Sequence, residues 1–267
     1  MAPLLAGAVV AAVLGALLAL GIHHAQEHQR PTPADSRAKI ALFVLGLLLF
    51  LLACGLPGAS VLPTMMSHVL LAFVVPPLLL LGTPRAALLP LFAHRRPRRI
   101  LQMLTRPARA AVIFLVVFFG CYLPSVLNAT MANEGLRFAM GMVILAASVL
   151  FWWPLVEPFP AWDRELADIG KLLYLFIGSS VLKALGFILA IVPRPIYTLP
   201  NPSRSLWRLS AINDQQYAGW LMVCAGTFVL LAAATIVCAH LLHDPDEDDV
   251  PATGRPAPSQ RSDAELA

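Results

Sequence analysis

Charged side chains are scarce in this sequence: 13% of its 267 residues are Asp, Glu, Lys or Arg, whereas 58% are hydrophobic. A soluble domain carries roughly 25% charged residues and about half apolar ones. No apolar stretch alternates with period two, as the strands of a membrane barrel do, and several reach the length of about 18 residues that a spanning helix needs. The composition therefore excludes an ordinary soluble domain and predicts an all-α integral membrane protein.

The short motifs of common enzyme classes are also missing. The sequence contains no Walker loop, no GxGxxG entering a helix, no HExxH, and no serine or cysteine nucleophile with a nearby histidine. Its four cysteines, Cys54, Cys121, Cys224 and Cys238, lie in apolar runs without CxxC spacing, so they indicate neither a disulfide framework nor a zinc site. We therefore expect no catalytic residues and no enzymatic activity.

Apolar runs predict a bundle of about seven transmembrane helices within a single domain, residues 1–243. The first run lacks a basic start and a small-x-small cleavage pattern, so we expect it to remain as a helix. The remaining segment, residues 244–267, is acidic and rich in proline, and we expect it to be a disordered cytoplasmic tail. The predicted spans are residues 2–22, 39–56, 65–83, 109–127, 137–156, 170–192 and 217–242.

The orientation follows from a cluster of arginines around the loop between the third and fourth runs. This cluster consists of Arg85, Arg95, Arg96, Arg98, Arg99, Arg106 and Arg109. The positive-inside rule places it in the cytoplasm, which puts the N-terminus outside and the C-terminus inside. Fourteen of the 19 lysines and arginines then lie on the cytoplasmic side and four outside. We interpret the arginines as orientation signals and expect no nucleic-acid partner.

In this orientation, soft metal ligands gather near the outer face. Met65 and His68 are three residues apart and therefore share a face of the third run, and His68 is the only one of seven histidines on the outer side. Thioether and imidazole groups suit Cu(I). We therefore hypothesise a copper site formed from Met65, Met66, His68, Met140 and Met142, although methionine is also a common filler of apolar cores.

Polar side chains are predicted at the same depth on several runs, and such groups usually face a bundle interior or a cavity. Cys54 ends the second run, and the fourth run is predicted to place Cys121, Ser125 and Asn128 on one face. The seventh run offers a second such face with Asp214, Tyr217 and Cys224. We therefore expect a water-accessible cavity that opens to the outer side.

Lys183 lies near the middle of the sixth run, and no acidic residue occurs inside any predicted span to neutralise it. An intramembrane charge is functional by default, although a lysine can also extend its head group toward the interface. In the third run, Pro76 and Pro77 remove two backbone donors and should disrupt the helix.

Four segments of the sequence resemble the CtaG-type cytochrome c oxidase assembly family. They are MMSHVLLAFVVPPLLLLGTP, LFWWPLVEP, PRPIY and LWRLSAINDQQYAGWLM, which follow one another in the expected order between about residues 60 and 242. The resemblance implies a seven-span protein of the bacterial plasma (inner) membrane, linked to maturation of the oxidase and its copper centre. It also implies oxidase subunits and copper chaperones as partners, and copper as the one cofactor to expect.

Carried over residue by residue, the resemblance matches His68 to the second histidine of a pair in the third span, while Thr64 stands at the first. Tyr122 stands where the family has a histidine near the end of the fourth span. The resemblance further implies a shared outer surface with Arg194, Pro195 and Tyr197 after the sixth run and Asp214, Gln215 and Gln216 at the seventh.

Two alternatives to copper handling stay open at this point. A transporter or channel for a small solute or metal ion would use Lys183 and the disrupted third run as features of its pathway. A scaffold that holds oxidase subunits without any metal is favoured by the absence of the family's other histidines from this chain.

Overall fold

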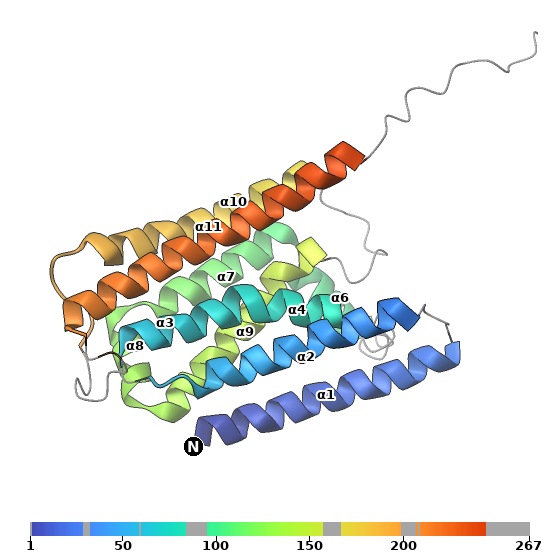
Figure 1. Cartoon of the computed structure of the whole chain (residues 1–267), viewed down its shortest axis with the longest axis horizontal. Helices are drawn as coiled ribbons and strands as arrows, with labels where there is room; N and C mark the ends of the chain where they lie inside the picture. The colour runs from blue at the N-terminus through green and yellow to red at the C-terminus, as the bar shows by residue number, and fades with distance from the viewer. Residues whose placement is uncertain are drawn as a thin grey trace, which may run out of the picture.

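The computed structural model describes residues 2–28, 33–58, 60–83, 95–156, 167–198, 207 and 209–243. All regular structure in these ranges is helical, as predicted (Figure 1). The predicted tail at 244–267 lies outside the described residues. The helices are α1 (Ala2–His28), α2 (Pro33–Gly55), α3 (Val61–Val69), the π-helix η1 (Leu70–Val74), α4 (Val75–Gly82), α6 (Arg95–Leu104), α7 (Pro107–Cys121), α8 (Pro124–Ala132), α9 (Glu134–Val156), α10 (Asp168–Ile191) and α11 (Ala211–His243).

By length and composition, five helical segments of the described chain can cross a membrane, or six if the bent pair α6 and α7 forms one span. The chain is therefore a multi-pass helical membrane protein. The described apolar part of α1, Pro3–Ala16, is shorter than the five spanning segments. The number of seven spans therefore stays a prediction, and so does their orientation. The five segments are Arg37–Gly55, Val61–Gly82, Glu134–Val156, Ile169–Ile191 and Ala211–Ala232.

The long helices lie side by side, with α10 and α11 together along one edge of the bundle and α1 along the opposite edge (Figure 1). Between them, α3 packs against α11, α7 packs against α9, and α4 packs against α2. The start of α3, the short α8 and the start of α11 lie at one end of the bundle, whereas α6 lies at the other end. We call the first of these the α8 end.

Aromatic side chains fill the core between α7, α9 and α10. The ring centroids of Phe114 and Phe151 are 4.6 Å apart, and those of Phe151 and Tyr174 are 4.7 Å apart. Tyr174 also donates a hydrogen bond to the Phe151 carbonyl at 3.0 Å. Packed aromatic pairs of this kind contribute about 0.5–1.5 kcal/mol beyond the burial of their surface, and they fix the three helices against one another.

The third span contains a π-helical turn, η1, which ends two residues before Pro76. In an α-helix the N–H of residue 76 would donate to the carbonyl of Ala72, and proline has no N–H to donate. The indole Nε1 of Trp152 on α9 donates to that carbonyl instead, at 2.9 Å. Trp152 therefore satisfies the backbone group that Pro76 leaves free, and it joins α9 to the third span.

Replacing Trp152 with phenylalanine should destabilise the bundle by about 1–3 kcal/mol, because the Ala72 carbonyl would be left buried without a donor. We expect a lower melting temperature in detergent. Trp220→Phe is the matched control, because Trp220 is 47% exposed and makes an edge contact with Phe187. Equal melting temperatures for the two variants would contradict this role.

The predicted fourth span, residues 109–127, is wrong as a single helix. α7 ends at Cys121, and α8 begins at Pro124. Proline at the first turn of a helix is favourable, but it biases the preceding residue, here Leu123, away from helical geometry. The break turns the chain at the α8 end, and it separates Cys121 from Ser125 and Asn128, which were predicted to share its face.

Candidate functional site

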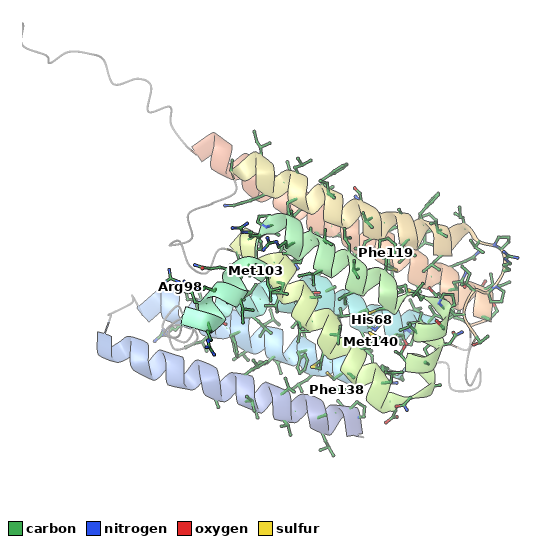
Figure 2. All side chains as sticks on the ribbon, turned by 180° about the vertical axis from the view of Figure 1, so that it is seen from behind. His68, Arg98, Met103, Phe119, Phe138 and Met140 are labelled. Carbon is green, nitrogen blue, oxygen red and sulfur yellow. The ribbon has the colours of Figure 1, made fainter. Side chains whose placement is uncertain are left out.

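A sulfur–imidazole cluster, consisting of His68, Cys121, Tyr122 and Met140, lies inside the α8 end of the bundle. The His68 ring on α3 meets the Tyr122 ring edge-on, with centroids 5.7 Å apart. Cys121, the last residue of α7, places its Sγ 3.0 Å from the Met140 Sδ on α9. Figure 2 shows His68 and Met140 beside each other in projection. The cluster thus joins three helices that are distant in sequence.

Two polar atoms of this cluster are buried without a hydrogen-bond partner among the described residues, His68 Nδ1 and Tyr122 Oη. His68 is 2% exposed and Tyr122 is 4% exposed. Leaving a buried polar atom unpaired costs about 1–3 kcal/mol, and native structures retain few such atoms without a reason, such as a bound ion or water. Imidazole, thiol and thioether groups, which this cluster combines, are the ligand types of soft metals.

The five predicted metal ligands are only partly brought together. Met65 is fully buried one turn before His68, and Met140 lies in the cluster. Met66 is two residues from His68 and Met142 is two residues from Met140, so each lies roughly 200° around its helix from that partner. One ion therefore cannot take all five. Among the described residues, no group of three or more His, Cys, Asp or Glu side chains could hold a metal ion, so a site here would need methionine sulfur.

The residues predicted to line an outer cavity are distributed more widely than expected. Cys54 is buried against α1, with its Sγ 3.2 Å from the Cβ position of Gly7. Ser125 and Cys224 are exposed, as is Tyr217 at 54%. Of Asp214, Tyr217 and Cys224, only Asp214 is buried in the bundle, so the other two do not line its interior. The cavity itself stays a prediction.

The segment after α10 is held against the cluster by two hydrogen bonds. Tyr197 donates its phenol to the Tyr122 carbonyl at 3.0 Å, and the side-chain oxygen of Asn128 on α8 accepts from the Thr198 N–H at 3.1 Å. Burial raises the pKa of Tyr197 to about 12, so its hydroxyl stays protonated and donates at physiological pH. Tyr197 therefore positions the residue whose ring contacts His68.

Gln215, the middle residue of the DQQ motif, connects α11 to the end of α10. Its side-chain oxygen accepts from the Ile196 N–H at 2.7 Å, and its amide nitrogen donates to the carbonyls of Leu189 and Arg194 at 3.4 and 3.3 Å. Leu189 lies in the last turn of α10, where carbonyls lack helical partners. Arg194 contributes only this backbone oxygen, and its side chain is exposed, while Gln216 is half-buried.

The side chain of Asp214, on α11, caps the N-terminus of α3. Ser60 stands at the N-cap position of α3 but makes no side-chain capping bond. The Asp214 carboxylate on α11 accepts the Val61 N–H instead, at 2.6 Å, although the two residues are 153 positions apart. A negative charge at a helix N-terminus is stabilising. Asp214 therefore fixes the start of α3, the helix that carries Met65 and His68.

Replacing Asp214 with alanine should lower the stability of the bundle by about 1–2 kcal/mol, the usual cost of a lost cap. We expect a lower melting temperature and faster proteolysis near the start of α3. Asn213→Ala is the control, because Asn213 is the exposed neighbour on the same turn. Equal melting temperatures for Asp214→Ala and Asn213→Ala would mean that the capping bond does not contribute to stability.

Lys183 is half-buried, and its side chain contacts both α10 and α11. Its aliphatic stem packs against Gly226 on α11, with Cγ 3.1 Å from the position a Cβ would take. Its Nζ lies 5.9 Å from the centre of the Phe176 ring, about two turns nearer the start of α10. This geometry favours a cation held by an aromatic face over a charge that lines a pathway.

Arg137 is a residue of this end that the sequence did not single out. Its guanidinium group lies directly over the α-carbon of Gly58, where any side chain would collide with it. The available signals were a lone arginine at the start of a predicted span and a Pro57-Gly58 turn facing it.

The family model described as cytochrome c oxidase caa3 assembly factor (Caa3_CtaG) matches residues 16–244. No curated protein and no solved structure matches the chain.

Proposed function

Because the chain belongs to the family of cytochrome c oxidase caa3 assembly factors, we propose that it assists the maturation of the copper centre of a haem-copper oxidase. It would act at the outer face of a bacterial plasma membrane, without catalytic residues of its own. Copper would be a transient cargo. The oxidase subunit that accepts the metal would be its main partner, and a copper chaperone would supply it.

The observation that carries this proposal is a pair of linked contacts. Buried His68, whose Nδ1 has no partner among the described residues, meets the Tyr122 ring, and the neighbouring Cys121 places its Sγ beside the Met140 Sδ. These three donors, an imidazole, a thiol and a thioether, suit Cu(I) rather than Mg²⁺ or Ca²⁺. Met65, one turn from His68, is the fourth soft donor within reach of the same helix face. Methionine and cysteine would thus supply the ligands that the family's histidines supply elsewhere.

A neutral site is physically suited to this depth in the membrane. Cu(I) bound by one thiolate and neutral donors carries no net charge, whereas an unpaired ion in hydrocarbon is costly. Tyr197, Gln215 and Asp214 would hold α3 and the α7–α8 junction in place around the ligands. The exposed segment around Arg194 lies at the same end and would face the accepting oxidase subunit.

A metal-free scaffold is the second candidate, and one observation favours it. Thr64, at the first family histidine position, uses its hydroxyl to bond the Ser60 carbonyl at 2.8 Å within its own helix. That position therefore offers no metal ligand. A transporter has less support, because Lys183 packs against neighbouring helices as described above.

The proposal is tested by oxidase activity and haem spectra in membranes of a deletion strain, grown with and without added copper. Loss of activity that copper restores is the expected result. Loss that copper does not restore would favour the scaffold, and normal oxidase in both conditions would contradict an assembly role. Complementation with the parent chain and with Cys121→Ser separates the contribution of the cluster from that of the whole chain.

A further inference from the structure

The helix α6 has an unusual relation to the span that follows it. The axes of Arg98–Leu104 and Pro107–Cys121 meet at 74°. If α7 crosses the bilayer, α6 must therefore lie close to the membrane plane at the end opposite α8. Two bonds keep the bend in place: Arg109 Nη1 donates to the Met103 carbonyl at 3.2 Å, and Thr105 Oγ1 donates to the Leu101 carbonyl at 2.7 Å.

One face of α6 combines arginines with apolar side chains. Arg96, Arg99, Ile100 and Met103 have the spacing i, i+3, i+4 and i+7, which places them on one side of the helix. All four are exposed, Ile100 at 59% and Met103 at 55%. Figure 2 shows α6 with Arg98 and Met103 labelled at the edge of the bundle. Neither water nor a protein core suits such a mixed face, whereas the boundary between lipid head groups and acyl chains suits both kinds of side chain.

The charges of this face have no acidic neighbours in sequence. No Asp or Glu occurs between Asp35 and Glu134, a stretch that contains all seven arginines of the cluster. Arginine binds phosphate groups through two parallel hydrogen bonds, and basic segments near a membrane surface bind anionic lipids. The complementary charge must then come from outside this part of the chain.

We propose that the α6 face formed by Arg96, Arg99, Ile100 and Met103 is a binding site for anionic phospholipids. Ile100 and Met103 insert at the acyl boundary, while Arg96 and Arg99 bind head-group phosphates. The apolar pair is the reason for choosing a lipid over free phosphate, which would leave both side chains exposed. This site is independent of the sulfur–imidazole cluster at the α8 end of the bundle.

Native mass spectrometry of the detergent-solubilised full chain, titrated with phosphatidylglycerol or phosphatidylcholine, tests the proposal. The parent should prefer phosphatidylglycerol, and Arg96→Gln/Arg99→Gln should lower that preference by roughly 30-fold, at about fivefold per arginine. Arg96→Lys/Arg99→Lys should keep most of it, because the charge is retained. Arg194→Gln, an exposed arginine at the α8 end, should leave it unchanged.

Equal affinity of the parent for the two lipids would overturn the proposal. It would also be overturned if Arg96→Gln/Arg99→Gln kept the preference for phosphatidylglycerol. If that variant also lost a polypeptide that co-purifies with the parent, the α6 face would be a protein-docking surface instead. Ile100→Ser/Met103→Ser should weaken binding of both lipids alike, which separates insertion from charge. Melting temperatures of all variants show whether each retains its fold.

Discussion

Gly219→Leu should separate α10 from α11 and destabilise the bundle by about 3 kcal/mol, the upper end of the usual cost of overpacking, because the atoms in the way are rigid. A Cβ on Gly219 would lie 2.5 Å from the Gly186 carbonyl oxygen and 2.6 Å from the Ala190 nitrogen. These are backbone atoms, so no rotamer change can relieve the collision. Small residues at helix crossings let membrane helices approach closely, and here the approach depends on two glycines that face each other.

The control for this variant is Gly120→Leu on α7. A Cβ on Gly120 would have no atom within 4 Å, and the two substitutions add the same side chain. Thermal denaturation in detergent, followed by size-exclusion chromatography, should show the Gly219 variant melting earlier or aggregating while the control stays near the parent. Similar behaviour of the two variants would mean that the close crossing does not determine stability.

The crossing also matters for the site at the α8 end. Gly219 lies within two turns of Asp214 and Gln215 on α11. A displaced α11 would withdraw the Asp214 carboxylate from Val61 and the Gln215 amide from the end of α10. We therefore expect destabilisation at Gly219 to loosen α3 and the cluster around His68.

Much of the fold could be predicted from local signals. Long apolar runs predict spanning helices because the bilayer requires both apolar side chains and internally bonded backbone. Pro76 predicts a disrupted third span for a similarly local reason. The break at Pro124 carried the same signal, and it was missed because the apolar run continues through Leu127 and conceals the change in backbone direction.

The long-range contacts could not be predicted in this way. The Trp152 bond to the Ala72 carbonyl and the Asp214 cap on α3 each join residues that are far apart in sequence, and nothing local to either partner identifies the other. Asp214 was predicted only as a polar residue of an outer cavity and surface, and its role as a cap for α3 was not foreseen. The contact of Cys121 with Met140 is of the same kind, since it depends on how α7 packs against α9.

Cys121→Ser should weaken Cu(I) binding by more than about 100-fold, if the cluster is the copper site. Removing its thiol leaves Met140 and His68 without the one donor that can carry a negative charge, and changes outside the ligand shell already cost about 10–100-fold. Competition with a Cu(I) chelator under reducing conditions measures the change directly on the purified full chain.

Cys54→Ser is the matched control, because Cys54 is also buried but packs against Gly7 on α1. It should bind Cu(I) as the parent does. His68→Ala and Met140→Leu should each weaken binding as well, since both donors meet the same ion. If Cys121→Ser bound copper as tightly as Cys54→Ser, the cluster would not be a metal site. The unpaired His68 nitrogen would then need another partner, and the scaffold role would become the better explanation of family membership.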